Sequence, residues 1–276
     1  RTRSADEEYG NGVHQWYCGM QDAGGVLQKG PWVGNRFHWY CLFDNEDYRI
    51  TKGVKHRFQY DSQVKNGRGY YYPGTPEYKL MATGKNMDDV KVQEPVAPFN
   101  DGLTYTNSIS SNCLAFTTKY ADVTDPTIGR TDAYWPFLRY ADIVLIYAEA
   151  QCELNDGISQ DAIDALNDIR IRSNAKEASV TGDGAIETKV ELRSVIFEER
   201  AKELAYEGDR RWDLLRWGIY LDVMNSLGGI NEDGTRTPYD EGSINKRREF
   251  RHLLYPLPSL EVSTNMAIDK NNPGWN

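Results

Sequence analysis

The stretch ELRSVIFEERAKELAYEGDRRWDLLRWG, Glu191 to Gly218, decides the fold of this chain. Apolar or small residues recur in it at intervals of three and four, which keeps one side of an α-helix apolar. These residues are Phe197, Ala201, Leu204, Ala205, Gly208, Trp212 and Leu215. Thr188 and Glu191 have the spacing of a capping box, which marks the start of the helix. Gly208 can end this helix, and Asp209 can begin a second, shorter one.

Carboxylates and arginines are dense in the same stretch. Glu199, Glu203 and Glu207 follow one another at i, i+4 spacing, so neighbouring carboxylates repel unless arginines from other segments offset them. Paired carboxylates also perform acid/base catalysis, and a hydrolase that uses Glu203 or Glu207 is therefore one interpretation. No histidine or metal-ligand spacing accompanies these acids, which favours an Arg–Glu network that fixes a helical corner.

Residues 136–173 predict an αα-hairpin. The first helix has one face made of Tyr140, Ile143, Val144, Tyr147, Ala148, Gln151 and Leu154. The turn LNDG breaks this helix, and Ser159 after Ile158 is the expected N-cap of the next one. The second helix is expected to bury Ala162, Leu166 and Ile169. Two antiparallel helices cannot cover their outer faces alone, so other segments must pack on them.

The first 135 residues lack helical periodicity and are rich in glycine, proline and aromatic residues. We expect two regions: residues 1–135 as a loop-rich, aromatic-rich ligand-binding lobe, and residues 136–276 as a helical region with an extended C-terminal tail. So long a segment without regular structure is uncommon in a compact domain. For residues 61–135 we consider two explanations, which are compatible: the segment wraps helices supplied from elsewhere, and it contains short strands.

Composition and motifs narrow the class of function. A net charge of −9 argues against nucleic acid as the main partner. The four histidines lie in no catalytic motif, and there is no phosphate-binding glycine loop, so we assign no catalytic residue and no cofactor. The cysteines have no CxxC spacing, so a zinc site is not expected. The sequence does not decide whether two of Cys18, Cys41 and Cys113 form a disulfide. The run NEDG, 231–234, lacks the full twelve-residue calcium loop, so no metal site is predicted.

Aromatic residues make up 12% of the chain, including 18 Tyr and 7 Trp, and they concentrate on predicted loops beside planar hydrogen-bonding side chains. Flat aromatic faces stack on pyranose rings, and Arg or Asn side chains hydrogen-bond to sugar hydroxyls. Two clusters qualify as a glycan-binding surface: Trp32, Asn35, Arg36, Trp39 and Tyr40, and Asn66, Arg68, Tyr70, Tyr71 and Tyr72. The alternative is that these rings only anchor loops to the helices.

Three ordered segments resemble the SusD/RagB family of nutrient-binding lipoproteins from Bacteroidetes-type bacteria. The run EER…ELAYEGDRRWDLLRWG resembles the C-terminal signature of that family. The segment PFLRYADIVLIYAEAQCELN, residues 136–155, is similar to the RYAEVLLNYAEA helix of the family. The ending LLYPLPSLEVSTNMAIDKNNPGWN, residues 253–276, is similar to the YPIP…E…TNP…QNPGY ending of the family. Together these segments cover about half of the chain.

The resemblance implies a mainly α, SusD-like fold of tetratricopeptide-like helical hairpins with large irregular, loop-rich lobes. It implies a non-catalytic binding protein on the cell outer membrane that captures oligosaccharides or polysaccharides for import by a SusC-like TonB-dependent transporter. The full-length protein would be lipid-anchored, and this chain would be its C-terminal part, without the anchor. The alternative function is a peptide- or protein-interaction module, because tetratricopeptide-like helices also dock peptides.

Overall fold

The structure, a computed structural model, describes residues 10–34, 39, 42–44, 46–55, 57–71, 104–107, 115–226 and 248–275. The chain divides into two compact units, of residues 1–80 with 91–208 and of residues 81–90 with 209–276. The change from loops to helices near residue 135 lies inside the first unit. The assignment of residues 1–135 as a ligand-binding lobe stays a prediction.

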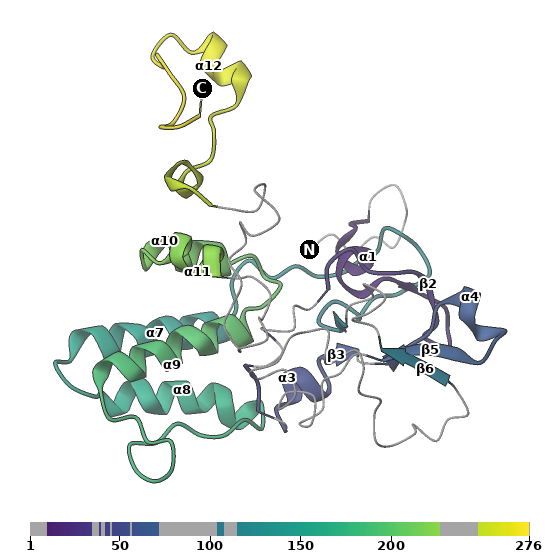
Figure 1. The fold of residues 1–276 in the computed structure, drawn as a ribbon, viewed down its shortest axis with the longest axis horizontal. Helices are drawn as coiled ribbons and strands as arrows, with labels where there is room; N and C mark the ends of the chain where they lie inside the picture. Colours follow the sequence, from purple (N-terminus) through teal and green to yellow (C-terminus); the bar gives the residue numbers. More distant parts are fainter. Residues whose placement is uncertain are drawn as a thin grey trace. The chain divides into compact units, whose positions relative to one another are not determined.

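Three helices form the main core of the first unit: α7 (Tyr140–Leu154), α8 (Gln160–Arg172) and α9 (Lys189–Glu203) (Figure 1). The Ser159 hydroxyl accepts the Ala162 N–H and caps α8, as the sequence predicts. Thr188 and Glu191 form the predicted capping box at the start of α9. The αα-hairpin is therefore confirmed. Its core buries Leu145, Leu166, Leu192 and Ile196 almost completely.

The buried face of α7 includes Val144 and Ala148 of the expected face but is otherwise different. Ala141, Val144, Leu145, Ala148 and Cys152 are buried, whereas Tyr140, Ile143, Tyr147 and Leu154 are exposed. The reason is that both α8 and α9 contact α7, and its small residues allow close approach of the neighbouring helices. The larger aromatic and aliphatic side chains consequently lie on the outer face. On α8, the expected burial of Ala162, Leu166 and Ile169 is confirmed.

Helix α9 ends at Glu203, earlier than the expected end at Gly208. The carbonyl groups at the end of α9 and just after it accept hydrogen bonds from other segments. Lys119 Nζ donates to the Glu203 and Ala205 carbonyls, and Arg139 Nη2 also donates to the Glu203 carbonyl. Tyr206 then adopts a φ of 69°, in the left-handed region, and its carbonyl accepts the Tyr120 hydroxyl. Cationic side chains at a helix C-terminus interact favourably with its dipole, so these contacts end the helix.

The loop-rich part of the first unit contains short helices and strands, which confirms the alternative that residues 61–135 hold short strands. Helices α1 (Val13–Cys18), α3 (Tyr48–Thr51) and α4 (Asp61–Val64) alternate with three small sheets. The strands are β1 (Met20–Gln21), β2 (Leu27–Lys29), β3 (Val54–Lys55), β4 (Arg57–Phe58), β5 (Arg68–Tyr71), β6 (Thr104–Asn107) and β7 (Phe116–Thr117).

Strand pairing joins segments distant in sequence. β1 pairs with β2 and β3 with β7, both antiparallel. β5 pairs with β4 antiparallel and with β6 parallel. Leu27, Phe58 and Phe116 form a small buried cluster beneath these strands. A second cluster centres on Tyr120 and Trp135, whose rings stack with centroids 5.5 Å apart. Leu27 belongs to β2, Phe58 to β4 and Phe116 to β7, so the first cluster joins one strand from each of the three sheets.

The second unit contains α10 (Arg210–Arg216), α11 (Tyr220–Ser226), the 3-10 helix η3 (Phe250–Leu253) and α12 (Ser259–Thr264). Asp209 is the N-cap residue of α10, although its side chain makes no capping hydrogen bond. The Arg211 guanidinium lies over the Tyr220 and Tyr255 rings and donates to the His252 carbonyl. Arg211 thus fastens the C-terminal tail, which is only partly extended.

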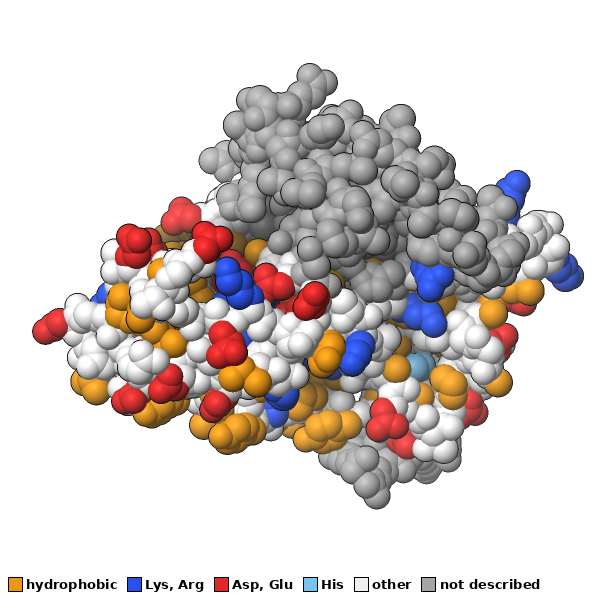
Figure 2. Space-filling view, turned by 90° about the horizontal axis from the view of Figure 1, so that it is seen from below, with side chains coloured by type: hydrophobic (Ala, Val, Ile, Leu, Met, Phe, Trp, Pro, Cys, Tyr) orange, Lys and Arg blue, Asp and Glu red, His pale blue; other side chains and the backbone are white. Residues whose placement is uncertain are grey.

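The surface of the helices mixes charges of both signs with small hydrophobic patches, on the face that Figure 2 shows. Among the described residues, no helix has the length and hydrophobicity needed to cross a membrane. Cys18 and Cys152 are buried free thiols, and burial raises the pKa of Cys18 to about 12. Cys41 and Cys113 lie outside the described residues, as does the NEDG run at 231–234.

Candidate functional site

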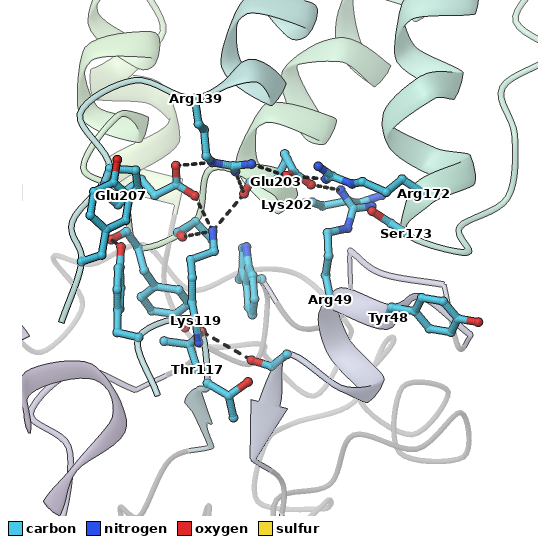
Figure 3. A pocket seen from close by; sticks show the side chains of 18 residues that line it. Tyr48, Arg49, Thr117, Lys119, Arg139, Arg172, Ser173, Lys202, Glu203 and Glu207 are labelled. Carbon is cyan, nitrogen blue, oxygen red and sulfur yellow. Dashed lines mark hydrogen bonds and ion pairs between the residues drawn. The ribbon is translucent and has the colours of Figure 1, made fainter. Parts of the chain in front are cut away.

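Two hollows in the described part of the first unit are candidate sites. The first, which we call the charged pocket, has a volume of about 520 Å³ and lies between the end of α9 and the loop-rich segments (Figure 3). Its charged lining residues are Arg49, Lys119, Arg139, Arg172, Lys202, Glu203 and Glu207. Its aromatic lining residues are Trp39, Tyr48, Tyr120, Tyr134 and Tyr206.

Glu203 and Glu207 lie one turn apart and share cations from three other segments. Arg139 donates from Nη1 to Glu203 and from Nε to Glu207, each over 2.6 Å, as Figure 3 shows. Arg172 reaches Glu203 over 2.6 Å, and Lys119 reaches Glu207 over 2.5 Å. Both carboxylates are buried. The repulsion expected between these acids is thus offset by neighbouring cations, as the Arg–Glu network interpretation requires.

Glu199 anchors a second part of the same network. Its carboxylate is fully buried and binds Arg49 over 2.5 Å and Arg170 over 2.8 Å. Arg49 also binds Asp47, which is itself buried and is the N-cap of α3. Glu199 belongs to α9, Arg170 to α8 and Arg49 to α3, so one carboxylate joins three helices.

This arrangement does not suit acid/base catalysis. Burial opposes ionisation of Glu203, but Arg139 and Arg172 outweigh it and hold the pKa of Glu203 below its usual 4.5. A general acid must keep its proton near neutral pH, and Glu203 does not. Burial also lowers the pKa of Lys119, although Glu207 partly offsets this. The Lys119 ammonium nevertheless has three acceptors, the Glu207 carboxylate and the Glu203 and Ala205 carbonyls.

The lowered pKa of Glu203 predicts how stability responds to acid. Because the pKa is lower in the folded than in the unfolded chain, ionised Glu203 stabilises the fold above pH about 4.5. That contribution is lost as the pH falls through the folded-state pKa. We expect the gap in unfolding free energy between the wild type and Glu203→Gln to narrow in urea titrations as the pH falls below about 4.5. The exposed Glu177→Gln is the control, and a gap that stays constant with pH would contradict the prediction.

The second hollow, the tryptophan groove, has a volume of about 650 Å³ and is lined by Gly10, Asn11, Gly12, Gln15, Trp16, Gly129 and Arg130. Helix α1 buries Val13, His14 and Cys18, which turns Gln15 and Trp16 outward. The Asn11 carboxamide accepts the Val13 N–H and donates to the Ala133 carbonyl, which fixes the start of α1.

Glycine shapes the tryptophan groove. A Cβ atom at Gly12 would lie only 2.9 Å from the Trp16 ring, and one at Gly129 would lie 3.0 Å from Gln15 Oε1. Trp16 is 45% exposed, so a substantial part of its surface is open to a ligand. Carboxamide and guanidinium groups surround the indole. A flat apolar ring beside planar hydrogen-bonding groups is chemistry that suits a sugar.

The sequence-predicted site residues fall in different places. Trp32 is 75% exposed, and its backbone N–H donates to the Trp16 carbonyl. Trp39 lines the charged pocket, donates from Nε1 to the Ala201 carbonyl over 2.8 Å and packs edge-on against Phe43 and Tyr206. This contact is of the kind that the loop-anchoring alternative describes.

The second predicted cluster is described only in part. Arg68 is exposed on β5, and Tyr70 and Tyr71 lie on the same strand, though their side chains are not described. Arg36, Tyr40 and Tyr72 lie outside the described residues, as does Asn35. The ligand-binding role of both clusters therefore stays a prediction.

Sequence reasoning missed Trp16, Tyr134 and Arg172 as candidate site residues. Trp16 had a usable signal, because an adjacent Gln15–Trp16 pair follows the flexible Gly10–Gly12 segment. No sequence signal indicated Tyr134 or Arg172, because the loop before α7 and the end of α8 come together only in the folded chain. In the described ranges, no three His, Cys, Asp or Glu side chains gather in a way that could hold a metal ion.

Comparison with known proteins places the chain. A model of the SusD family matches residues 34–275. SusD-like proteins P2 and P38 of Formosa agariphila are 33% and 36% identical to this chain over 142 residues, which is 50% and 49% of this chain and 25% of each relative.

Two solved structures share the fold. A SusD superfamily protein from Parabacteroides distasonis aligns with a TM-score of 0.56 and 17% identity over 99% of this chain and 49% of that protein. A SusD homolog from Bacteroides thetaiotaomicron aligns with a TM-score of 0.51 and 22% identity over 83% of this chain and 41% of that protein. The chain thus spans about half, or less, of the length of these proteins. With its mainly helical architecture and a family match over most of its length, this chain belongs to the SusD family.

Proposed function

We propose that this protein is a non-catalytic binding protein that captures an oligosaccharide at the cell surface. The observation that carries the proposal is the tryptophan groove, where a half-exposed indole lies among Asn11, Gln15 and Arg130. Family membership supports the same class of function. Trp32 is 75% exposed and its backbone N–H donates to the Trp16 carbonyl, so this residue of the first sequence-predicted cluster lies near the groove in the chain fold.

Capture would depend on stacking of the sugar on the indole and on hydrogen bonds from planar carboxamide and guanidinium groups. The exposed part of the indole removes apolar sugar C–H groups from water, and the groups around it replace the water bound to the hydroxyls. The indole is already held against Gly12, so little conformational freedom is lost when a ligand binds. The carboxylates of the charged pocket are engaged by cations, and this supports binding without hydrolysis.

Delivery to a SusC-like TonB-dependent transporter and lipid anchoring in the outer membrane are further parts of the proposal. They rest on the resemblance of the three sequence segments to the family and on the family match. The chain spans only part of the length of its relatives, so delivery and anchoring are proposed for a whole protein of this family. Glycan binding at the tryptophan groove can be tested with this chain.

The second candidate function is a peptide-interaction module. The outer face of α7 favours it, because Tyr140, Ile143 and Tyr147 are between 47% and 78% exposed along one side of a fifteen-residue helix. An amphipathic peptide helix docks on such an apolar face. This candidate predicts that binding depends on α7 and not on the tryptophan groove.

Isothermal titration with a panel of neutral and acidic oligosaccharides tests the proposal. We expect Trp16→Ala to weaken binding of the recognised glycan by about 2 kcal/mol, roughly 30-fold, because the stacking surface is lost. Trp32→Ala should weaken it less, since Trp32 lies at the edge of the surface. No sugar product should be released during the titration.

Trp212→Ala is the matched control, because Trp212 is 59% exposed but belongs to the second unit. Thermal melts monitored by circular dichroism verify that each variant folds. If Trp16→Ala and Trp32→Ala bind as the wild type does, the site assignment is wrong. If only peptides bind, and Tyr147→Ala abolishes that binding, the second candidate function replaces the first.

A further inference from the structure

Among the described residues, the cations of the charged pocket and of the adjoining Glu199 network outnumber the carboxylates that they contact. Three cations have their own acidic partner: Arg49 binds Asp47, Arg170 binds Glu199, and Lys202 binds Glu198. Lys119, Arg139 and Arg172 remain, and they share the two carboxylates of Glu203 and Glu207. Counted over the residues that the structure describes, one positive charge is therefore left over at the pocket wall, in a chain whose net charge is −9.

The excess charge is most accessible at Arg172. Lys119 already donates to three oxygen atoms, and Arg139 donates to both carboxylates and to the Glu203 carbonyl. Arg172 contacts Glu203 through Nη2, and within the described part of the chain the remaining N–H groups of its guanidinium have no acidic partner. Its side chain is 52% exposed, compared with 25% for Arg139 and 15% for Arg49.

Two exposed rings belong to the same pocket. Tyr48 is 42% exposed. It lies near Arg172, because the Tyr48 N–H donates over 2.8 Å to the carbonyl of Ser173, the residue after Arg172. Tyr134 is 52% exposed and lines the pocket together with Arg139. Lys52 Nζ covers one face of the Tyr48 ring, 3.5 Å from its centroid. The pocket thus combines the exposed Tyr134 ring, which can contact a sugar, with a planar guanidinium, which binds carboxylate or sulfate oxygens in a bidentate manner.

We propose that the charged pocket binds an anionic group, a carboxylate or a sulfate, carried by a sugar unit of the captured oligosaccharide, with Arg172 as its main contact. This inference rests on the proposed function and narrows its ligand to acidic glycans. A neutral sugar would leave the excess charge of Arg172 facing water. A divalent cation would be repelled by the three arginines that surround Glu203.

Matched probes separate charge from ring shape. Trigalacturonate, its neutral methyl ester and a sulfated galacto-oligosaccharide of equal length are titrated into the full chain. We expect one acidic probe to bind at least about tenfold more tightly than the methyl ester, since hydrogen bonds to charged groups are the stronger ones. The preference should decrease when the ionic strength is raised from about 0.01 M to about 0.15 M. The acidic probe that binds more tightly distinguishes a carboxylate from a sulfate.

Arg172→Gln should remove this preference and leave the weaker binding of the methyl ester unchanged. Arg193→Gln is the control, because Arg193 also pairs with a glutamate, Glu153, but on the surface outside the pocket. If the wild type binds the acidic probes and the ester with equal affinity, the inference is wrong but the proposal of glycan capture is unaffected. This comparison uses the wild type alone. An unchanged preference in Arg172→Gln also overturns it. If no oligosaccharide of any class binds, both proposals fail.

Discussion

Replacing Glu199 by alanine is expected to lower the free energy of unfolding by about 3–5 kcal/mol, because the change leaves buried cations without their partner. Glu199 is fully buried, and its two oxygen atoms bind Arg49 and Arg170. Without the carboxylate, Arg170 loses its ion pair and Arg49 keeps only Asp47 and a longer contact to Glu203. Urea unfolding followed by circular dichroism measures the change.

Glu198→Ala is the control for Glu199→Ala. Glu198 precedes Glu199 on α9, but its side chain is 44% exposed, and among the described residues its ion-pair partner is Lys202. Its partner Lys202 is buried, but the exposed carboxylate is already in contact with water, so we expect a smaller loss of stability from Glu198→Ala than from Glu199→Ala. If both variants lose the same small amount, Glu199 does not join the helices as described here, and the apolar core alone would account for their packing.

Replacing Arg139 by methionine is expected to lower the unfolding free energy by about 3 kcal/mol, because Arg139 bonds to Glu203 and Glu207 together. Methionine keeps much of the side-chain volume, so the effect reports the lost charge. Glu207 would depend on Lys119 alone among the pairs described, and the two carboxylates would repel each other more strongly. The unfolding midpoint in urea, measured at neutral pH, gives the magnitude.

The Arg139 result has two checks. Arg193→Met removes an arginine from the exposed pair with Glu153 and should change stability by less than about 1 kcal/mol. Adding Glu207→Gln to Arg139→Met should restore part of the loss, because one of the unneutralised carboxylates is then removed. A double variant that is less stable than Arg139→Met by the full effect of the second change would show that the residues do not interact.

The sequence predicts the helices well where their signals are local. The capping box at Thr188 and Glu191 and the cap at Ser159 depend on residues three positions apart, and both are present. The end of α9 was placed too late because Lys119 and Arg139, far away in the sequence, supply the donors for its last carbonyls. The buried face of α7 was misjudged because two neighbouring helices, and not the size of its apolar residues, determine which side is covered.

The candidate sites were less predictable for the same reason. Aromatic clusters can be found in a sequence, but Trp39 shows that a tryptophan on a loop can pack inward and donate to a helix carbonyl. The charged pocket combines α3, the loop before α7 and the ends of α8 and α9. Only the arginine-rich and glutamate-rich composition of Glu191–Gly218 indicated that distant cations must approach this stretch.

The ion pairs of Glu199 also bear on the order in which the chain folds. Arg170 lies 29 residues from Glu199, whereas Arg49 lies 150 residues away. Closing the longer loop loses more chain entropy, so we expect helices α7, α8 and α9 to form first and α3 to dock later. We also expect backbone amides of α3 to exchange hydrogen with solvent sooner than those of Leu166 or Ile196.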